Sequence, residues 1–284
     1  MRTAASRLPK GFSLEERLAA CASNFEPNPK SRAGQWRFWA PEGARRESPY
    51  AKGVLDLGCG KGEYTTACAA ARPDVLFVGL DVDGVCAMRA AECAIAAGVP
   101  NAVFVLHDDS DLAETFGAGE LSAILLNFPT PFPKKKKAQY RLTHFERLLS
   151  YRALLAPGAA VRLRTDSMPL RDFSLTQLKI AGYETQWETD DVRALFPDEP
   201  WSAYERKLVA QGAPVCGFAA VPNAGPAPEN PQQTAPLSLV SYLPDDIENL
   251  EYVPHGMQGC IDNMKGRRAN LRAKGKPEWT PPVI

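Results

Sequence analysis

From Gly53 onward, short apolar runs alternate with segments of helical character, and this alternation restricts the fold more than any other feature of the chain. Two parallel strands cannot be joined by a tight turn, so strands that alternate with helices are typical of a parallel sheet. The sequence therefore predicts an α/β fold built on a doubly wound, mostly parallel sheet. The expected strands are Val54–Leu57, Val75–Leu80, Ala102–Leu106, Ser122–Leu126, Ala160–Arg164, Glu184–Glu188 and Val215–Val221, and the expected helices are Glu63–Ala71, Gly84–Ala97, Thr143–Leu155 and Leu170–Ala181.

The fourth expected strand ends in an unusual way. Residues 121–126 are almost continuously apolar, as in a central strand, and Asn127 and Phe128 lead into the sequence Pro-Thr-Pro-Phe-Pro at 129–133 and then into Lys134–Lys137. Prolines lack the N–H donor and disfavour helix in the preceding residue, so the strand must stop and the chain must leave extended. Ligands of open α/β sheets bind beyond the carboxyl ends of the strands. A stiff loop there, next to four cations, predicts a site that handles a polyanion.

The global charge does not identify a partner, since 33 Lys and Arg residues balance 33 Asp and Glu residues. The distribution is more informative. Seven basic residues and one acid lie between Lys134 and Arg152, and six basic residues and one acid lie between Asp262 and Lys276. Such local patches are compatible with nucleic-acid binding, and they are also common on ordinary solvated faces.

The cysteines give no indication of a disulfide framework or a zinc site. The seven cysteines are scattered, with no C-x-x-C pair and no Cys/His cluster. No apolar run approaches the length of a membrane span, and the N-terminal residues lack the apolar core of a signal peptide. These patterns predict a reduced, cytoplasmic protein with no metal and no membrane partner, and they leave open whether it is a monomer or a homodimer.

Composition shifts suggest four regions. The polar start contains one short expected helix, Ser13–Cys21, which Ser13 and Glu16 would open as a capping box. Five prolines between 222 and 236 indicate a linker, and the residues after it are too few and too polar to build a core of their own, so they either dock on the main domain or remain flexible. We also expect 134–139 to be a mobile loop. The predicted regions are an N-terminal arm (1–36), a main domain (37–222), a Pro-rich linker (223–236) and a basic C-terminal extension (237–284).

A glycine-rich turn follows the first expected strand. Gly58, Gly60 and Gly62 alternate there, and alternating glycines let a ligand approach the backbone closely. Asp56 lies two residues before Gly58, where its carboxylate can face a cationic or amine-bearing ligand. Because the glycine pattern on its own is weak evidence, two features distinguish a nucleoside site from a dinucleotide site: Asp56 and the acid that ends the second expected strand.

Acids follow the second and third expected strands, Asp81 and Asp108. Asp81 ends the second expected strand, where a carboxylate can accept hydrogen bonds from both hydroxyls of a ribose; its alternative role is to cap a helix. Asp108 follows the third strand, where it can accept from an adenine amino group, although the neighbouring Asp109 and Ser110 could equally make this a capping region.

The D-x-G-x-G-x-G pattern with acids after strands two and three resembles class I S-adenosylmethionine-dependent methyltransferases. A dinucleotide-binding turn would read G-x-G-x-x-G, and here the third glycine comes one residue too early. The resemblance implies a Rossmann-like seven-stranded sheet and S-adenosylmethionine as the cofactor. It implies a cofactor site made of Asp56, Gly58, Gly60, Gly62, Asp81, Asp108 and Asn127.

The fourth-strand loop resembles the signature of the bacterial tRNA (guanine-N7)-methyltransferases. Residues 127–137 read N-F-P-T-P-F-P-K-K-K-K and 141–143 read R-L-T, beside the family's N-F-P/S-D-P-W-P-K-K-R-H and R-R-L-T. Further similar segments follow the family's order from about residue 34 to 222. They are Gly34-Gln35-Trp36, Arg164-Thr165-Asp166 and the run S-A-Y-E-R-K at 202–207.

This resemblance implies methyl transfer to N7 of a guanine in the tRNA variable loop, which forms 7-methylguanosine. N7 carries a lone pair and no proton, so the nucleophile needs no general base. Asp166 and Glu205 are the candidate carboxylates that accept from the guanine N1–H and N2–H₂ groups, and either could instead be a structural cap or a surface ion-pair partner. The family's acid in P-D-P is Thr130 here, so we expect an active but slower enzyme.

Contacts with tRNA are expected from three places. Lys134, Lys135 and Arg141 would neutralise phosphates, and Ser202 and Tyr204 belong to the segment that resembles the family's T-x-Y/F-E element. A second electrostatic contact would come from the tail residues Arg267, Arg268, Arg272, Lys274 and Lys276. Two other interpretations stay open: a class I methyltransferase with a small-molecule or protein acceptor, and a catalytically weakened tRNA-binding homologue.

Overall fold

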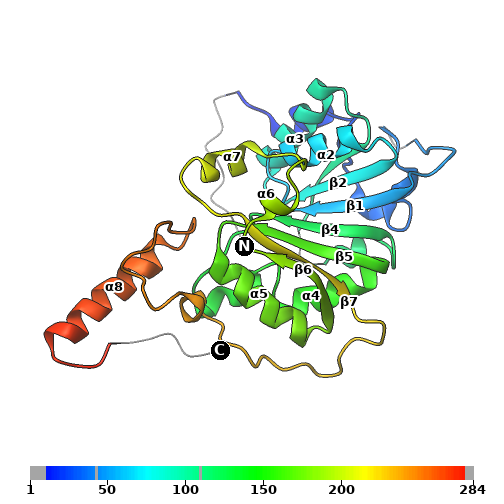
Figure 1. Ribbon diagram of the computed structural model, residues 1–284. Coiled ribbons are helices and arrows are strands. Elements are labelled where there is room, and N and C mark those ends of the chain that lie inside the picture. Colours follow the sequence, from blue (N-terminus) through cyan, green and yellow to red (C-terminus); the bar gives the residue numbers. More distant parts are fainter. Residues whose placement is uncertain (1–10, 42–43, 109–110, 279–284) are drawn as a thin grey trace. The chain divides into compact units, whose positions relative to one another are not determined.

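The computed structural model of the protein describes residues 11–41, 44–108 and 111–278 (Figure 1). The helices are α1 (Leu14–Ala19), α2 (Glu63–Ala71), α3 (Gly84–Ala97), α4 (Phe145–Leu154), α5 (Met168–Ile180), α6 (Val192–Leu195), α7 (Ala203–Val209) and α8 (Gln258–Ala273). The strands are β1 (Lys52–Leu57), β2 (Val75–Asp81), β3 (Ala102–Leu106), β4 (Leu121–Asn127), β5 (Leu155–Thr165), β6 (Tyr183–Thr189) and β7 (Cys216–Pro222). Each of the seven expected strands is present.

The sheet has the order β3-β2-β1-β4-β5-β7-β6. β1 pairs in parallel with both β2 and β4, β2 pairs in parallel with β3, and β6 and β7 form an antiparallel pair. The predicted doubly wound, mostly parallel fold is therefore confirmed. The chain runs outward from β1 through β2 to β3 and then returns to the other side of β1, and this reversal creates the kind of switch point beside which open α/β sheets bind ligands.

The chain divides into two compact units that cut across the predicted regions. The first unit comprises 1–127, 150–162 and 198–203, and the second comprises 128–149, 163–197 and 204–284. Asn127 and Phe128 are consecutive, so the chain passes directly from the end of β4 in the first unit into the proline loop of the second.

The core of the first unit lies where α2 and α3 pack against β1, β2 and β3 (Figure 1). The buried face of α3 carries Ala87, Ala90, Ala91 and Ala94, whose spacing puts them on one stripe of the helix. Small side chains let α3 approach closely, and the ring of Phe104 fills space beneath it. Ser13 begins α1 by accepting a hydrogen bond from the Glu16 N–H at 3.2 Å, as its position before Leu14 predicts.

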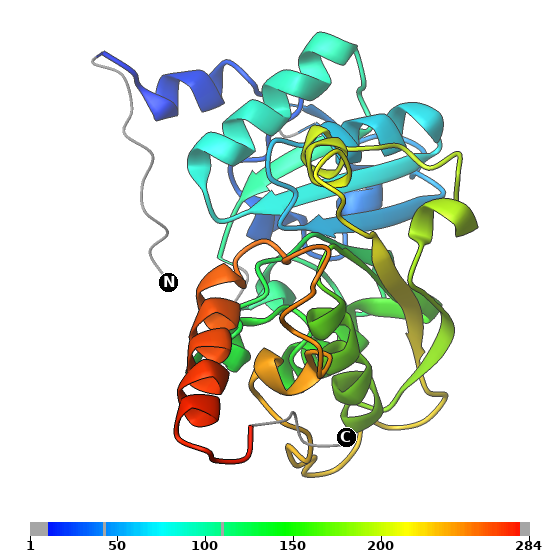
Figure 2. The ribbon, with the colours of Figure 1, turned by 60° about the vertical axis from the view of Figure 1, so that its left-hand side comes forward.

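The core of the second unit includes the C-terminal extension. A helical turn, η6 (Leu239–Tyr242), and the start of α8 pack on α5, which contributes Leu170 and Phe173 (Figure 2). Of the two fates predicted for the extension, docking is the one observed. The extension docks because it contains a few apolar side chains that are buried together, although its overall composition is polar. They are Leu239, Tyr242, Leu243, Ile247, Met257, Ile261 and Met264.

The prediction of a mobile loop at 134–139 is wrong. These residues form a 3₁₀ helix, η5 (Lys135–Tyr140), in which Lys137 N–H donates to Lys134 O at 2.9 Å. Ala138 is buried, and the Lys137 ammonium lies 4.9 Å from the centroid of the Tyr140 ring. The buried Ala138 methyl group and the i→i+3 hydrogen bonds order this segment, although its lysines are typical of a solvated loop.

Candidate functional site

The glycine turn joins β1 to α2, and its three glycines are required for different reasons. Gly58, Gly60 and Gly62 all have φ between +57° and +80°, which L side chains rarely adopt. A Cβ atom at Gly58 or Gly60 would meet nothing within 4 Å, whereas one at Gly62 would lie 2.6 Å from the Ala90 Cβ. Gly58 and Gly60 therefore leave an open backbone surface for a ligand, and Gly62 is required for the packing of α2 against α3.

Asp81 links the glycine turn to the end of β2. One carboxylate oxygen accepts from the Gly60 N–H at 2.9 Å, and the other accepts from the Asp83 N–H at 2.9 Å. Burial raises the pKa of Asp81 above its usual value, and these two N–H donors oppose that shift. Each oxygen keeps a second lone pair, so the carboxylate can still accept from ligand hydroxyls. Asp108 is exposed just beyond β3.

Asp56 differs from the expectation that it faces an amine-bearing ligand. Its side chain is 1% exposed, and it accepts from the Thr65 hydroxyl at 2.5 Å and from the Asn127 amide at 3.0 Å. In the structure Asp56 therefore holds α2 and the end of β4 in position. Asn127, which the sequence places at the end of the fourth strand, is half-buried and oriented by this bond.

The acceptor loop, defined here as residues 128–133, has a strained backbone. Phe128 and Phe132 have φ of +50° and +43°, a region that costs a non-glycine residue about 1–2 kcal/mol. The Phe128 N–H donates to Arg164 O at 2.7 Å. Strain of this kind persists where the surroundings over-determine the backbone, and it is concentrated at functional sites.

Arg141 supplies much of that restraint. Its Nε and Nη2 donate to the carbonyls of Pro131 at 3.0 Å and Phe132 at 2.8 Å, and its guanidinium lies 4.2 Å from the Phe173 ring centroid. The side chain is 0% exposed, and burial lowers its pKa to about 10. This corrects the expected phosphate contact, because a guanidinium enclosed in the protein and bonded to loop carbonyls does not face solvent.

Asp166 follows the last residue of β5 and is 5% exposed. Its Oδ2 accepts two hydrogen bonds, from the Tyr252 hydroxyl at 2.8 Å and from the His255 backbone N–H at 2.9 Å. Both donors come from the C-terminal extension. Burial, together with this bond to Asp166, raises the pKa of Tyr252, so its hydroxyl stays protonated and remains a donor.

Tyr204, in α7, has an exposed aromatic ring. Its side chain is 41% exposed, and its ring makes edge-to-face contacts with Phe128 at 5.7 Å and His255 at 6.2 Å. Burial and the nearby Asp166 charge raise the pKa of Tyr204. Rings from the acceptor loop, α7 and the C-terminal extension are thus brought together.

Glu205 is buried and carries two ion pairs. Its side chain is 1% exposed; Oε1 accepts from Arg164 Nη2 at 2.6 Å and from Arg193 Nε at 2.6 Å, and Arg193 Nη2 also pairs with Oε2. Glu205 is thus an ion-pair partner, as one alternative to base recognition predicts, but the pair is buried and not at the surface as that alternative had it. The arrangement joins α7, α6 and β5.

The remaining predicted positions lie nearer the surface. Thr130, Lys134 and Lys135 are exposed, and Ser202 is half-buried. Thr130 is thus accessible in the acceptor loop, and Lys134 and Lys135 are available to an anion where Arg141 is not.

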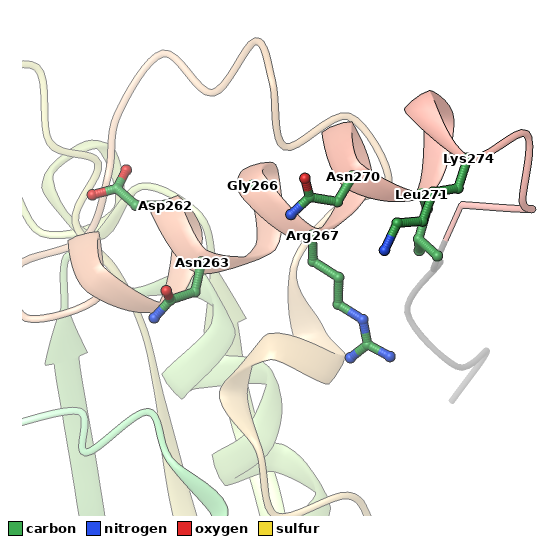
Figure 3. Close-up of a pocket in the computed structure, with 7 residues that line it drawn as sticks. All are labelled: Asp262, Asn263, Gly266, Arg267, Asn270, Leu271 and Lys274. Atoms are coloured by element: carbon green, nitrogen blue, oxygen red, sulfur yellow. The ribbon is translucent and has the colours of Figure 1, made fainter.

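The tail cations fall into two groups on α8. Arg268 and Arg272 pair with Glu248, and Arg268 is almost wholly buried. Arg267 and Lys274 instead line a shallow hollow on one face of the helix (Figure 3). The other lining residues are Asp262, Asn263, Gly266, Asn270 and Leu271.

The Gly34-Gln35-Trp36 segment has a structural explanation. The Glu120 carboxylate accepts from the backbone N–H groups of Gly34 at 2.8 Å, Trp36 at 2.7 Å and Gly117 at 2.8 Å, and the Trp36 indole donates to Thr115 O at 2.7 Å. Trp36 is fully buried. These bonds fasten the segment before β1 to the first unit.

Sequence reasoning missed Tyr252, His255, Thr65 and Glu120. None belongs to a motif with a recognisable spacing, and each acts through a partner at least 80 residues away except Thr65, which is nine residues from Asp56. No local signal could have found the first two, since only the docking of the extension brings them to Asp166.

Within 11–41, 44–108 and 111–278, no group of three or more His, Cys, Asp or Glu side chains is arranged to hold a metal ion. No helix of that part of the chain combines the length and apolar character that a membrane crossing needs.

Comparison with known proteins identifies the family. A family model described as "Putative methyltransferase" matches residues 51–217. The tRNA (guanine-N(7)-)-methyltransferase of Brevibacillus brevis is 30% identical over 190 residues, which cover 66% of this chain and 86% of that protein. The chain belongs to the tRNA (guanine-N7)-methyltransferase family. The resemblance expected from its motifs is thereby confirmed.

Two further relatives carry the same name. The protein of Geobacillus kaustophilus is 30% identical over 199 residues, covering 70% of this chain and 88% of its own length, and that of Limosilactobacillus reuteri is 32% identical over 163 residues, covering 57% and 76%. The C-terminal extension, including Tyr252, His255 and α8, lies beyond the residues that the family model matches.

Proposed function

We propose that this protein transfers a methyl group from S-adenosylmethionine to N7 of a guanine in the variable loop of tRNA. The observation that carries the proposal is the match to relatives of that name over 86% of the length of one of them. The sheet, the open glycine turn and the strained acceptor loop supply compatible sites. With a tRNA substrate, we expect the reaction to take place in the cytoplasm.

The residues of the first unit suit S-adenosylmethionine. Gly58 and Gly60 present a backbone surface that a Cβ would fill, and Asp81 and Asp108 offer acceptors for the ribose hydroxyls and the adenine amino group. Asp56 acts through Asn127 by fixing the amide at the end of β4. When bound, the cofactor supplies a methyl group on a positively charged sulfur.

The chemistry at the acceptor requires positioning more than proton transfer. Guanine N7 attacks with a lone pair, so Thr130 need not act as a base. Holding two reactants in line can supply about 7–11 kcal/mol of the barrier reduction. Positive charge moves to the purine as the methyl group arrives, and the Asp166 carboxylate would stabilise that charge while accepting from the guanine edge. Glu205 would contribute indirectly, by fixing Arg164 and Arg193.

Contact with the tRNA backbone is assigned to exposed cations. Lys134 and Lys135 lie beside the acceptor loop, and Arg267 and Lys274 share one face of α8. Phosphate contacts of this kind give affinity without sequence information, and that affinity falls as the salt concentration rises. Ser202 and Tyr204 would lie closer to the reacting base.

Thr130 favours a second candidate, a catalytically weakened tRNA-binding homologue. Replacing an acid by a hydroxyl removes one charge-assisted hydrogen bond, which is worth about 1.5–3 kcal/mol. The open glycine turn argues for retained catalysis, since a protein that only binds tRNA has no use for a cofactor surface.

The test is to incubate the purified protein with unmodified tRNA transcripts and radiolabelled S-adenosylmethionine, digest the RNA and look for 7-methylguanosine. A transcript whose variable-loop guanine is replaced by adenine is the matched control. Label in 7-methylguanosine from the first transcript alone supports the proposal. The Thr130→Asp variant should be about tenfold faster or more. Label from the variant but not from the native protein would establish the weakened homologue, and label from neither would point to another acceptor.

A further inference from the structure

We propose that residues 245–257 of the C-terminal extension form part of the guanine-recognition site. In this proposal Tyr252 and the His255 backbone position Asp166, and the His255 ring completes an aromatic surface with Tyr204. The inference rests on the proposed function, because Asp166 and Tyr204 are the residues assigned there to the base.

The hydrogen bonds to Asp166 orient its carboxylate. Both protein donors, the Tyr252 hydroxyl at 2.8 Å and the His255 N–H at 2.9 Å, bind Oδ2. Among the described residues, no donor reaches Oδ1 and no basic side chain forms an ion pair with Asp166. A buried carboxylate with one oxygen held by the protein and the other without a donor is arranged to accept from a ligand N–H.

The aromatic surface suits a purine. Tyr204 is 41% exposed, and edge-to-face contacts with Phe128 and His255 hold its ring in place. Stacking of a base on an aromatic side chain is worth about 1–3 kcal/mol, and proteins that read single-stranded RNA commonly combine such stacking with hydrogen bonds to a base edge. An exposed ring near an oriented carboxylate matches that combination.

The extension is anchored firmly enough to position these groups. The Leu239 N–H donates to Pro133 O at 3.0 Å, a Cβ at Gly256 would lie 3.5 Å from the Pro131 Cγ, and the Ser167 hydroxyl lies 3.4 Å from the Met257 sulfur. Its apolar residues are buried against α5 on both sides of Tyr252 in the sequence. Tyr252 is therefore held between anchored segments and its hydroxyl has a defined position.

The test uses the full chain and compares two Tyr→Phe variants of the same extension. Tyr252→Phe removes the donor to Asp166. Tyr242→Phe removes a hydroxyl that donates to Pro236 O at 2.9 Å, and this ring packs on Phe173 in the core. A third variant, His255→Ala, keeps the backbone N–H and removes only the ring.

For Tyr252→Phe we expect kcat for 7-methylguanosine formation to fall about tenfold or more, with unchanged dissociation constants for S-adenosylmethionine and tRNA. Tyr242→Phe should keep the native kcat even if its melting temperature falls. His255→Ala should raise KM for tRNA with a smaller effect on kcat. The inference is overturned if Tyr252→Phe keeps the native kcat, or if both Tyr→Phe variants lose kcat equally. A native protein that makes no 7-methylguanosine would refute the proposed function itself, and the inference with it.

Discussion

Glu205→Gln is the substitution that most sharply separates a structural from a catalytic carboxylate. Glu205 is 1% exposed and neutralises Arg164, which is equally buried, and Arg193, which is largely buried. Glutamine keeps the size and removes the charge, so both guanidinium groups lose a buried carboxylate partner. Breaking a buried ion pair in this way costs about 3–5 kcal/mol. We therefore expect the free energy of unfolding to fall by about that amount.

The assay is urea-induced unfolding, together with methylation measured at a temperature where the variant is folded. Glu199→Gln is the matched control, because Glu199 pairs with Arg162 at 2.7 Å and both side chains are 22% exposed. Partial exposure screens that pair, so its removal should cost below about 1 kcal/mol. A Glu205→Gln variant with native stability and no methylation would refute the reasoning and assign Glu205 to the base instead.

Two other predictions follow from the glycine turn and from α8. Gly60→Ala should weaken S-adenosylmethionine binding, measured by calorimetry, with little loss of stability beyond backbone strain. Gly62→Ala should lower the melting temperature more, because its Cβ would lie 2.6 Å from the Ala90 Cβ. Equal melting temperatures for the two variants would contradict this reasoning. Substituting both Arg267 and Lys274 by Gln should reduce the slope of log Kd for tRNA against log salt concentration by about 0.7–0.9 for each phosphate that the protein no longer neutralises. Arg272→Gln should leave the slope unchanged, because Arg272 already pairs with Glu248 and Glu278. Identical slopes for the native protein and both variants would remove α8 from the tRNA interface.

Local patterns were sufficient to predict the sheet, the glycine turn and the proline loop. Most of the strands contain apolar runs, with the polar β6 as an exception. The glycine turn needs backbone conformations that only glycine adopts readily. The acceptor loop could be predicted because proline restricts the backbone whatever surrounds it. Asp81 and Asp108 could be proposed as site residues because the carboxyl ends of parallel strands lie at one edge of the sheet.

Predictions about individual charged side chains were less successful, because sequence does not show what lies around a charge. Arg141 belongs to a cationic run, yet its side chain is buried and bonded to loop carbonyls. Asp56 is a well-placed acid whose oxygens are both occupied by the protein. Burial and hydrogen-bond partners decide whether a charge faces a ligand or holds the fold, and both come from distant parts of the chain.

By itself, the sequence determined the order of the strands along the chain, the glycine turn, the proline loop and the family to which the chain belongs, because these depend on backbone restrictions and on motifs a few residues long. The helices α6, α7 and α8 were not predicted. Only the tertiary structure decided that Glu205 carries a buried ion pair and that Tyr252 and His255 reach Asp166. The extension contributes to that site because a few apolar side chains bury themselves on α5, and the free energy of burying them depends on a surface that no local pattern encodes.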